Sequence, residues 1–143
     1  MSVFKDEKEF RKVFEQIFKL MNEHDEVGRA LWEARAPHRF VITDLGLEFN
    51  VTWATDAEAA KGRFLTWVWG EAPWEPTITL QMSSDTANKY FQGKENIATA
   101  VIFGRVKVGG PMSTILRLAP VTGPIHPVYR KWLEDHGYQH LVA

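Results

Sequence analysis

The chain contains no cysteine. This absence excludes disulfide frameworks, catalytic thiols and thiolate metal sites, and it fits a reducing compartment. An excess of positive charge is missing too, because 17 Lys and Arg residues face 18 Asp and Glu residues, for a formal net charge of −1. Nothing in the overall charge favours binding to a polyanion, so we expect no nucleic-acid partner.

Long apolar runs are absent as well. The N-terminal sequence MSVFKDEKEFRK lacks the apolar core of a signal peptide. No later window approaches the roughly 18 uninterrupted apolar residues that a membrane-spanning helix needs. We therefore expect a cytoplasmic protein, and a length of 143 residues predicts one domain, 1–143.

Side-chain patterns typical of catalysis are scarce. No serine lies in a GxSxG motif. His126, His136 and His140 gather near the C-terminus, and the last two have the spacing of a helical metal pair. Gly137 interrupts that helix, so we expect no metal, no cofactor and no enzymatic activity. An enzyme that uses these histidines remains a third alternative.

The segment Phe91–Gly110 holds four glycines, and a basic residue directly follows Gly93 and Gly104. It lacks the first glycine and the final hydroxyl of the phosphate-binding pattern GxxxxGK[ST]. We interpret Gly93 and Gly104 as the stops of two helices. Arg105 and Lys107 share the outward face of the next strand, where they either discourage edge pairing or contact a charged headgroup.

Aromatic residues are abundant, at 13% of the chain. Each can bury about 150–250 Å², so they predict either an aromatic core or an apolar cavity with aromatic walls. Helical spacing predicts helices over residues 6–22, 25–34, 84–92 and 96–103, with a last helix from Pro124 to His136. Alternation predicts strands over residues 45–54, 64–69, 77–82 and 105–108, the first two paired antiparallel. Residues 112–119 fit a helix or a strand, and residues 138–143 are expected to trail.

The segment ITLQMSSDTANKYFQGKENIATAVIFGRVKVGG, residues 78–110, resembles the central motif of the sterol-carrier-protein type 2 family. The likeness lies in Ser84-Asp85 after a strand, in a helix that ends at Gly93, and in the alternating run Gly104 to Val108 that leads to Gly110. Pro111 replaces an acidic residue common in the family, and residues 120–143 have no obvious family equivalent. The resemblance implies an α+β fold, with a mostly antiparallel five-stranded sheet covered on one face by helices and enclosing an apolar tunnel.

The resemblance also implies a function without catalysis, namely binding and transfer of a hydrophobic ligand. The ligand would be a fatty acyl chain, acyl-CoA, a sterol or a phospholipid, and the protein would make transient membrane contact. The alternative is an accessory or interaction subunit whose tunnel is filled with aromatic side chains. From inward strand positions and the helices that cover them, we predict a ligand-binding wall of Phe49, Val51, Leu80, Met82, Phe91, Ile102, Phe103, Met112, Ile115 and Leu116.

Overall fold

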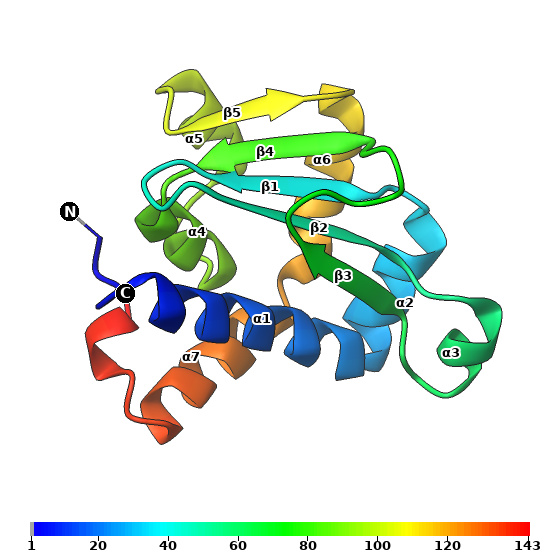
Figure 1. The fold of residues 1–143 in the computed structure, drawn as a ribbon, viewed down its shortest axis with the longest axis horizontal. Helices are drawn as coiled ribbons and strands as arrows, with labels where there is room; N and C mark the ends of the chain where they lie inside the picture. Colours follow the sequence, from blue (N-terminus) through cyan, green and yellow to red (C-terminus); the bar gives the residue numbers. More distant parts are fainter. Residues whose placement is uncertain (1) are drawn as a thin grey trace.

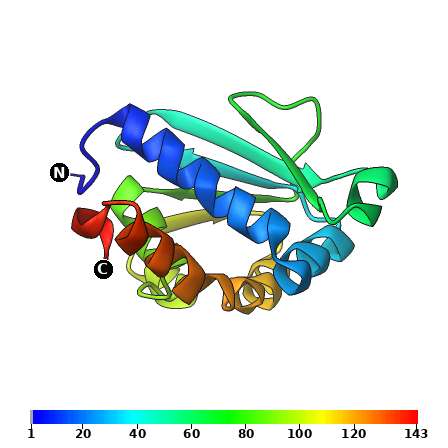
Figure 2. The ribbon, with the colours of Figure 1, turned by 90° about the horizontal axis from the view of Figure 1, so that it is seen from below.

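A five-stranded sheet organises the protein, and helices pack on one of its faces (Figures 1 and 2). The computed structural model describes residues 2–143. The strands follow the order β3-β2-β1-β4-β5, and every neighbouring pair is antiparallel except β1 and β4. Their bounds are β1 His38–Ile42, β2 Leu47–Trp53, β3 Leu65–Trp69, β4 Ile78–Met82 and β5 Val106–Gly109. The expected α+β class and mostly antiparallel five-stranded sheet are confirmed.

The helices differ in length, and this difference matters for the site. In the order of the chain they are α1 Glu7–Glu23, α2 Asp25–Ala34, α3 Asp56–Ala60, α4 Ser84–Phe91, α5 Ile97–Ile102, α6 Met112–Leu118 and α7 Ile125–Asp135. Two short 3₁₀ segments follow α6 and α7, η1 Ala119–Thr122 and η2 Gln139–Leu141. Within residues 2–143, no helix combines the length and the apolar character needed to cross a bilayer.

Local signals in the sequence explain where several helices begin and end. The Asp6 carboxylate accepts a hydrogen bond of 2.8 Å from the Glu9 amide and caps α1. The Asn96 side chain caps α5 in the same way, at 3.0 Å from the Thr99 amide. Gly93 follows α4 with a φ of 75°, in the left-handed region that glycine adopts at little cost. The interpretation of this glycine as a helix stop is confirmed.

Alternation along the strands makes one face of the sheet apolar. Phe40 of β1 lies opposite Phe49 of β2 and opposite Leu80 of β4, and all three side chains are buried under the helices. The polar residues between them, such as Glu48 and Gln81, belong to the other face. The apolar face therefore forms the floor on which α1, α4, α5 and α6 pack.

Three local expectations are resolved or corrected. Residues 112–119 form a helix, α6, whose last turn continues into η1. The prediction that residues 138–143 trail is wrong, because Leu141 is only 1% exposed. Its carbonyl accepts hydrogen bonds of 2.8 Å from both Asn88 and Gln92, which hold the C-terminal segment against α4. Strand β1 was not predicted.

Candidate functional site

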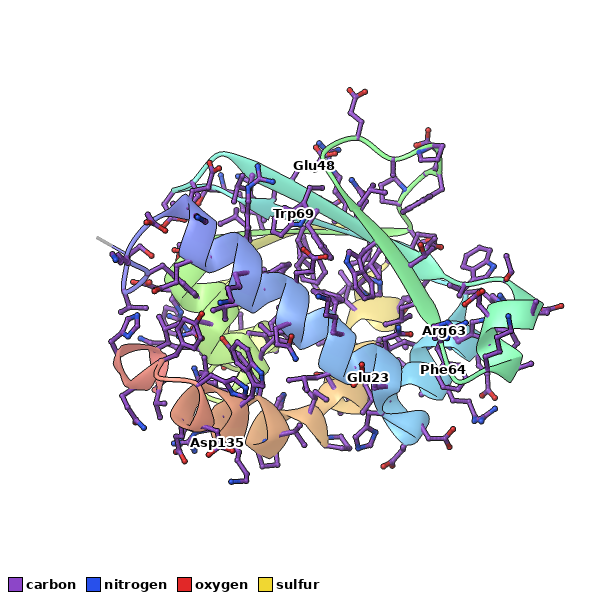
Figure 3. The ribbon with its side chains drawn as sticks, turned by 60° about the horizontal axis from the view of Figure 1, so that its bottom comes forward. Glu23, Glu48, Arg63, Phe64, Trp69 and Asp135 are labelled. Carbon is purple, nitrogen blue, oxygen red and sulfur yellow. The ribbon has the colours of Figure 1, made fainter. Side chains whose placement is uncertain are left out.

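Aromatic rings fill the part of the helix–sheet space that lies under α1. The Phe14 ring centroid lies 5.5 Å from that of Phe40 and 5.1 Å from that of Phe49, in edge-to-face geometry. Trp69 of β3 extends this cluster beside α1 (Figure 3), and its indole nitrogen donates to the Glu15 carboxylate at 3.4 Å. Phe18, Phe40 and Phe91 of this cluster also form one side of a cavity in the neighbouring part of the interior.

The cavity beside this cluster has a volume of about 50 Å³. Its floor is the inner face of β1, β2, β3 and β4, and its roof comes from α1, α2, α4, α5, α6 and η1. A water molecule needs roughly 10–15 Å³ on the same measure, so the cavity admits a few water-sized groups. The residues that line it beneath the roof include Val51, Ile78, Leu80, Phe91, Ile97, Ile115 and Leu118.

No Asp, Glu, Lys or Arg side chain lines this cavity among residues 2–143; its polar lining consists of His38, Thr52, Tyr90 and Thr122. His38 Nδ1 lies 2.6 Å from the Ala36 carbonyl, which can only accept, so Nδ1 carries the proton. Burial lowers the pKa of His38, which keeps the ring neutral and leaves Nε2 as an acceptor. Burial likewise raises the pKa of Tyr90, whose hydroxyl has Thr122 as its hydrogen-bond partner.

Four of the ten predicted wall residues line the cavity: Val51, Leu80, Phe91 and Ile115. Phe49 and Met82 are buried in the core away from it. The remaining four lie on the surface, with exposed fractions of 78% for Ile102, 71% for Phe103, 37% for Met112 and 46% for Leu116.

The phase and the ends of two short helices explain why those four side chains are exposed. Helix α5 buries Ile97 and Ala100, and Ile102 and Phe103 at its end point away from that face. Helix α6 buries Ile115 and Leu118 and turns Leu116 outward, whereas Met112 is exposed at the first position of the helix. In helices of six and seven residues the sequence offers too few turns to fix the phase.

The cavity meets solvent at Trp53. This residue is 39% exposed, more than any other lining residue of the described chain. The Arg35 guanidinium lies over its ring, 5.1 Å from the centroid, and 4.1 Å from the Trp32 ring centroid. Sequence reasoning did not identify His38, Tyr90 or Arg35, although the alternation of residues 45–54 did place Trp53 on the apolar face.

Three of the other sequence-based candidates for chemistry, His136, His140 and Arg105, have structural partners. His136 Nδ1 lies 2.8 Å from the Trp132 carbonyl, whereas His140 Nε2 lies 2.8 Å from the Glu9 carboxylate. Across residues 2–143, no three His, Asp or Glu side chains converge as metal ligands. Arg105 donates two hydrogen bonds of 2.9 Å to Glu95, which lower the pKa of that carboxyl group. Arg105 is therefore already paired, at a site distinct from the cavity.

The model of the SCP-2 sterol transfer family matches residues 14–122, which include every strand and the cavity floor. The chain belongs to the SCP-2 sterol transfer family. The matched range ends at η1, so α7 and the docked C-terminal segment lie outside it. Among curated proteins, no relative of the sequence is found.

Solved structures of the SCP-2 family share this fold at low sequence identity. The apo form of sterol carrier protein 2 from Yarrowia lipolytica has a TM-score of 0.61 and 16% identity, over 88% of this chain and 98% of that one. A protein described as UbiJ-SCP2, a ubiquinone synthesis protein, has a TM-score of 0.55 and 16% identity, over 78% of this chain and 96% of that one. At such identities the likeness shows the fold alone.

The SCP-2 fold also occurs inside a larger enzyme. The inverting sec-alkylsulfatase Pisa1 from Pseudomonas sp. has a TM-score of 0.54 and 18% identity, over 66% of this chain. This chain spans only 14% of the length of Pisa1. Family membership and fold together indicate lipid binding or transfer as the class of function of this SCP-2 chain.

Proposed function

We propose that this SCP-2 chain binds a hydrophobic ligand, and transfers it, by taking hydrocarbon into the cavity beside Trp53. The observation that carries the proposal is the lining, which is apolar except for four uncharged polar side chains. Burying each CH₂ group of a ligand contributes about 0.8 kcal/mol, and no catalytic group is needed. Fatty acyl chains, acyl-CoA, sterols and phospholipids all supply such hydrocarbon.

The neutral lining restricts how these ligands could bind. An unpaired charge inside would lose its hydration without compensation, which is strongly unfavourable. A carboxylate, a phosphate or the nucleotide of acyl-CoA must therefore remain outside, at or beyond Trp53. A hydroxyl or carbonyl group, by contrast, could enter, because His38 Nε2 and the hydroxyl pair of Tyr90 and Thr122 offer hydrogen bonds.

A cavity of about 50 Å³ is smaller than an acyl chain, so binding requires part of the wall to move. Helix α6 is the best candidate, because Ile115 and Leu118 are its only buried residues. Its N-cap position is Pro111, which makes no side-chain hydrogen bond to the helix. Displacing α6 would expose these two side chains and extend the cavity under the helix.

The filled-core alternative also has an observation in its favour. The aromatic cluster under α1 packs tightly against the sheet, and the cavity beside it measures only about 50 Å³. An accessory or interaction subunit that keeps the fold and takes up no ligand would have such an interior. The two functions differ in whether lipid enters.

Native mass spectrometry tests the proposal. The protein should retain a co-purified lipid or take up added palmitate, hexadecanol or cholesterol, and its tryptophan fluorescence should change because Trp53 lines the cavity. Ala119→Phe, which adds a ring at a lining position, should weaken uptake, whereas Val128→Phe on exposed α7 surface should not. A wild-type protein that stays empty with all three ligands would leave the accessory role as the better function.

A further inference from the structure

Arg35 stands at the cavity mouth in an unusual setting. Its guanidinium lies over the rings of both Trp32 and Trp53, at 4.1 and 5.1 Å from their centroids. The Trp32 ring is itself fixed, since its indole nitrogen donates to the Ala54 carbonyl at 2.9 Å. Stacking orders the side chain while leaving its N–H groups, which lie in the ring plane of the guanidinium, at the edge of the stack.

The carboxylate nearest to Arg35 holds it weakly. Arg35 Nη2 lies 3.8 Å from Asp56 Oδ1, beyond hydrogen-bond distance, and the Asp56 side chain is 91% exposed. The Arg35 side chain is 40% exposed, so its donors can reach solvent or a ligand. Arg105, in contrast, has both donors committed to Glu95. The Arg35 guanidinium is thus held in place, and its N–H groups are available to donate two hydrogen bonds to one anion.

The backbone of Arg35 adds an independent observation. With a φ of 52°, it is the one non-glycine residue with a positive φ in residues 2–143. Glycine or asparagine adopts this helix-ending conformation at lower cost. The conformation places Arg35 beside Trp53 and directly before Ala36, and both of these residues line the cavity. A strained arginine next to a cavity mouth points to a role for its side chain.

We propose that Arg35 is a subsite for the anionic headgroup, carboxylate or phosphate, of a lipid whose chain lies in the cavity. This proposal rests on the proposed function and specifies its ligand class. The neutral lining holds the hydrocarbon and keeps the charge outside, and Arg35 meets that charge where Trp53 separates cavity from solvent. The stacked guanidinium has lost much of its freedom beforehand, so headgroup binding orders little more of the protein.

Matched lipids and matched arginines test the headgroup subsite. Affinities for palmitate, hexadecyl phosphate and the uncharged methyl palmitate are measured for the wild type, Arg35→Gln and the control Arg63→Gln. Arg63 is an exposed arginine after α3 that pairs with Glu58 (Figure 3). Arg35→Gln should weaken one or both anionic lipids about tenfold, as expected for a hydrogen bond to a charged group, and leave methyl palmitate unchanged.

The arms of this experiment separate its outcomes. If Arg35→Gln weakens the binding of palmitate alone, the subsite takes a carboxylate headgroup. If it weakens the binding of hexadecyl phosphate alone, the subsite takes a phosphate headgroup. An equal loss for the ester would show that Arg35 only supports the cavity wall, and unchanged binding of all three lipids would show that it has no role; either result overturns the subsite. If the wild type binds none of the lipids, the proposed function itself fails, which is a distinguishable result.

A different surface carries a second inference, independent of the cavity. The edge formed by α5, β5 and α6, at the top of Figure 1, exposes Ile102, Phe103, Met112 and Leu116. Ile102 and Phe103, adjacent in sequence, are 78% and 71% exposed, the two largest exposures among the large apolar side chains of the described residues. Apolar groups so exposed are typical of a surface that meets a partner.

The charge around this edge indicates the kind of partner. Residues 93–118, which include α5, β5 and α6, contain four Lys and Arg residues and a single carboxylate, Glu95. This segment has a formal charge of +3, and the rest of the chain carries −4, because the total is −1. Lys94, Lys107 and Arg117 have no carboxylate within 4.0 Å among the described residues.

We infer that this edge, defined by Ile102, Phe103, Met112 and Leu116, docks on a bilayer of anionic phospholipid. The apolar side chains would enter the interface between headgroups and acyl chains, and the surrounding cations would attract the negative surface. A second copy of the chain is a poorer partner, because this edge would meet its own positive charge. Docking here would also bring the outer face of α6 to the membrane.

Vesicle sedimentation of the ligand-free protein tests the docking edge. Binding to vesicles of phosphatidylcholine with phosphatidylserine should exceed binding to phosphatidylcholine alone. The Ile102→Ser/Phe103→Ser double variant should bind the anionic vesicles about tenfold more weakly, and the matched control Val3→Ser/Val128→Ser should bind like the wild type. Both control positions are exposed, at 46% and 39%.

Two results would overturn this second inference. The first is equal binding of the double variant and the wild type to anionic vesicles. The second is no vesicle binding together with a dimer in sedimentation equilibrium that the double variant abolishes, which would assign the edge to self-association. Neither measurement depends on whether the cavity takes up a ligand.

Discussion

The part of the sheet under α1 and the part under α5 and α6 carry similar apolar strand residues, but they are covered in different ways. Helix α1 has 17 residues and buries six of them, five being aromatic or β-branched side chains at Phe10, Val13, Phe14, Ile17 and Phe18. Helix α6 has seven residues and buries two. Most of the first cover packs directly on the sheet, and the cavity of about 50 Å³ lies between the last buried residues of α1, Phe18 and Met21, and the shorter helices.

This difference assigns separate tasks to the two parts. Close packing of aromatic rings gives large dispersion and burial gains, so the sealed half under α1 should supply most of the stability. The hollow half under α6 gives up some of those contacts, and a wall held by few residues can move at lower cost. Stability and ligand access can then vary separately in one small fold.

The largest effect is expected in the sealed half. Phe14→Ala should lower the free energy of unfolding by about 3–5 kcal/mol, because it removes a ring at the centre of the cluster and leaves a cavity. Phe14 is 1% exposed, and six other aromatic rings lie within about 6 Å of its own ring. Urea denaturation followed by far-UV circular dichroism measures the change. The control Val128→Ala, on exposed surface, should stay within about 0.5 kcal/mol of the wild type.

A smaller effect is expected in the hollow half. Ile115→Ala should lower the free energy of unfolding by about 2 kcal/mol. This value is at the lower end for such truncations, since Ile115 already borders empty space. The enlarged cavity should at the same time bind hexadecanol more tightly than the wild type does. The neighbouring Leu116→Ala, at an exposed position on the same helix, should change neither quantity. A cost equal to that of Phe14→Ala would contradict the division between the two halves.

Patterns along the sequence predicted most of the fold because the deciding contacts are local. The six-residue apolar stripe of α1, the alternation in β2 and the glycine after α4 each act within a few residues. Strand β1 was not predicted because it begins with two polar residues, His38 and Arg39. Only Phe40 and Ile42 remain to show apolar alternation, which is too short a pattern to predict a strand. Its place in the centre of the sheet depends on pairing with β2 and β4, which the segment itself does not encode.

The site was predicted less completely because its members meet only through distant contacts. Val51, Leu80 and Phe91 could be chosen from strand phase and helix spacing. The residues at the cavity mouth could not be predicted in this way. Arg35 and Trp53 are 18 residues apart in the sequence, and they meet because the chain turns at Arg35, the C-cap of α2, with a positive φ. The C-terminal segment is a similar case, since Asn88 binds the Leu141 carbonyl from 53 residues away.

The smallest expected effect concerns pH and the hollow half. The pKa of His38 is lower in the folded protein than in the unfolded chain, because burial disfavours the charged ring. The unfolded state therefore binds a proton first, and the free energy of unfolding should fall as pH drops below about 6.5. His126 contributes in the same direction, since burial also lowers its pKa. Urea titrations at a series of pH values from neutral to acidic measure the slope.

Replacing single histidines isolates the share of His38. His38→Gln keeps a side-chain donor for the Ala36 carbonyl but cannot titrate, so the free energy of unfolding of this variant should fall less on acidification than that of the wild type. His136→Gln, at the exposed C-cap position of α7, is the matched control. If His38→Gln leaves the slope unchanged, the ring is reached by water even without ligand. The wall of the hollow half would then open more readily than its two buried α6 residues suggest.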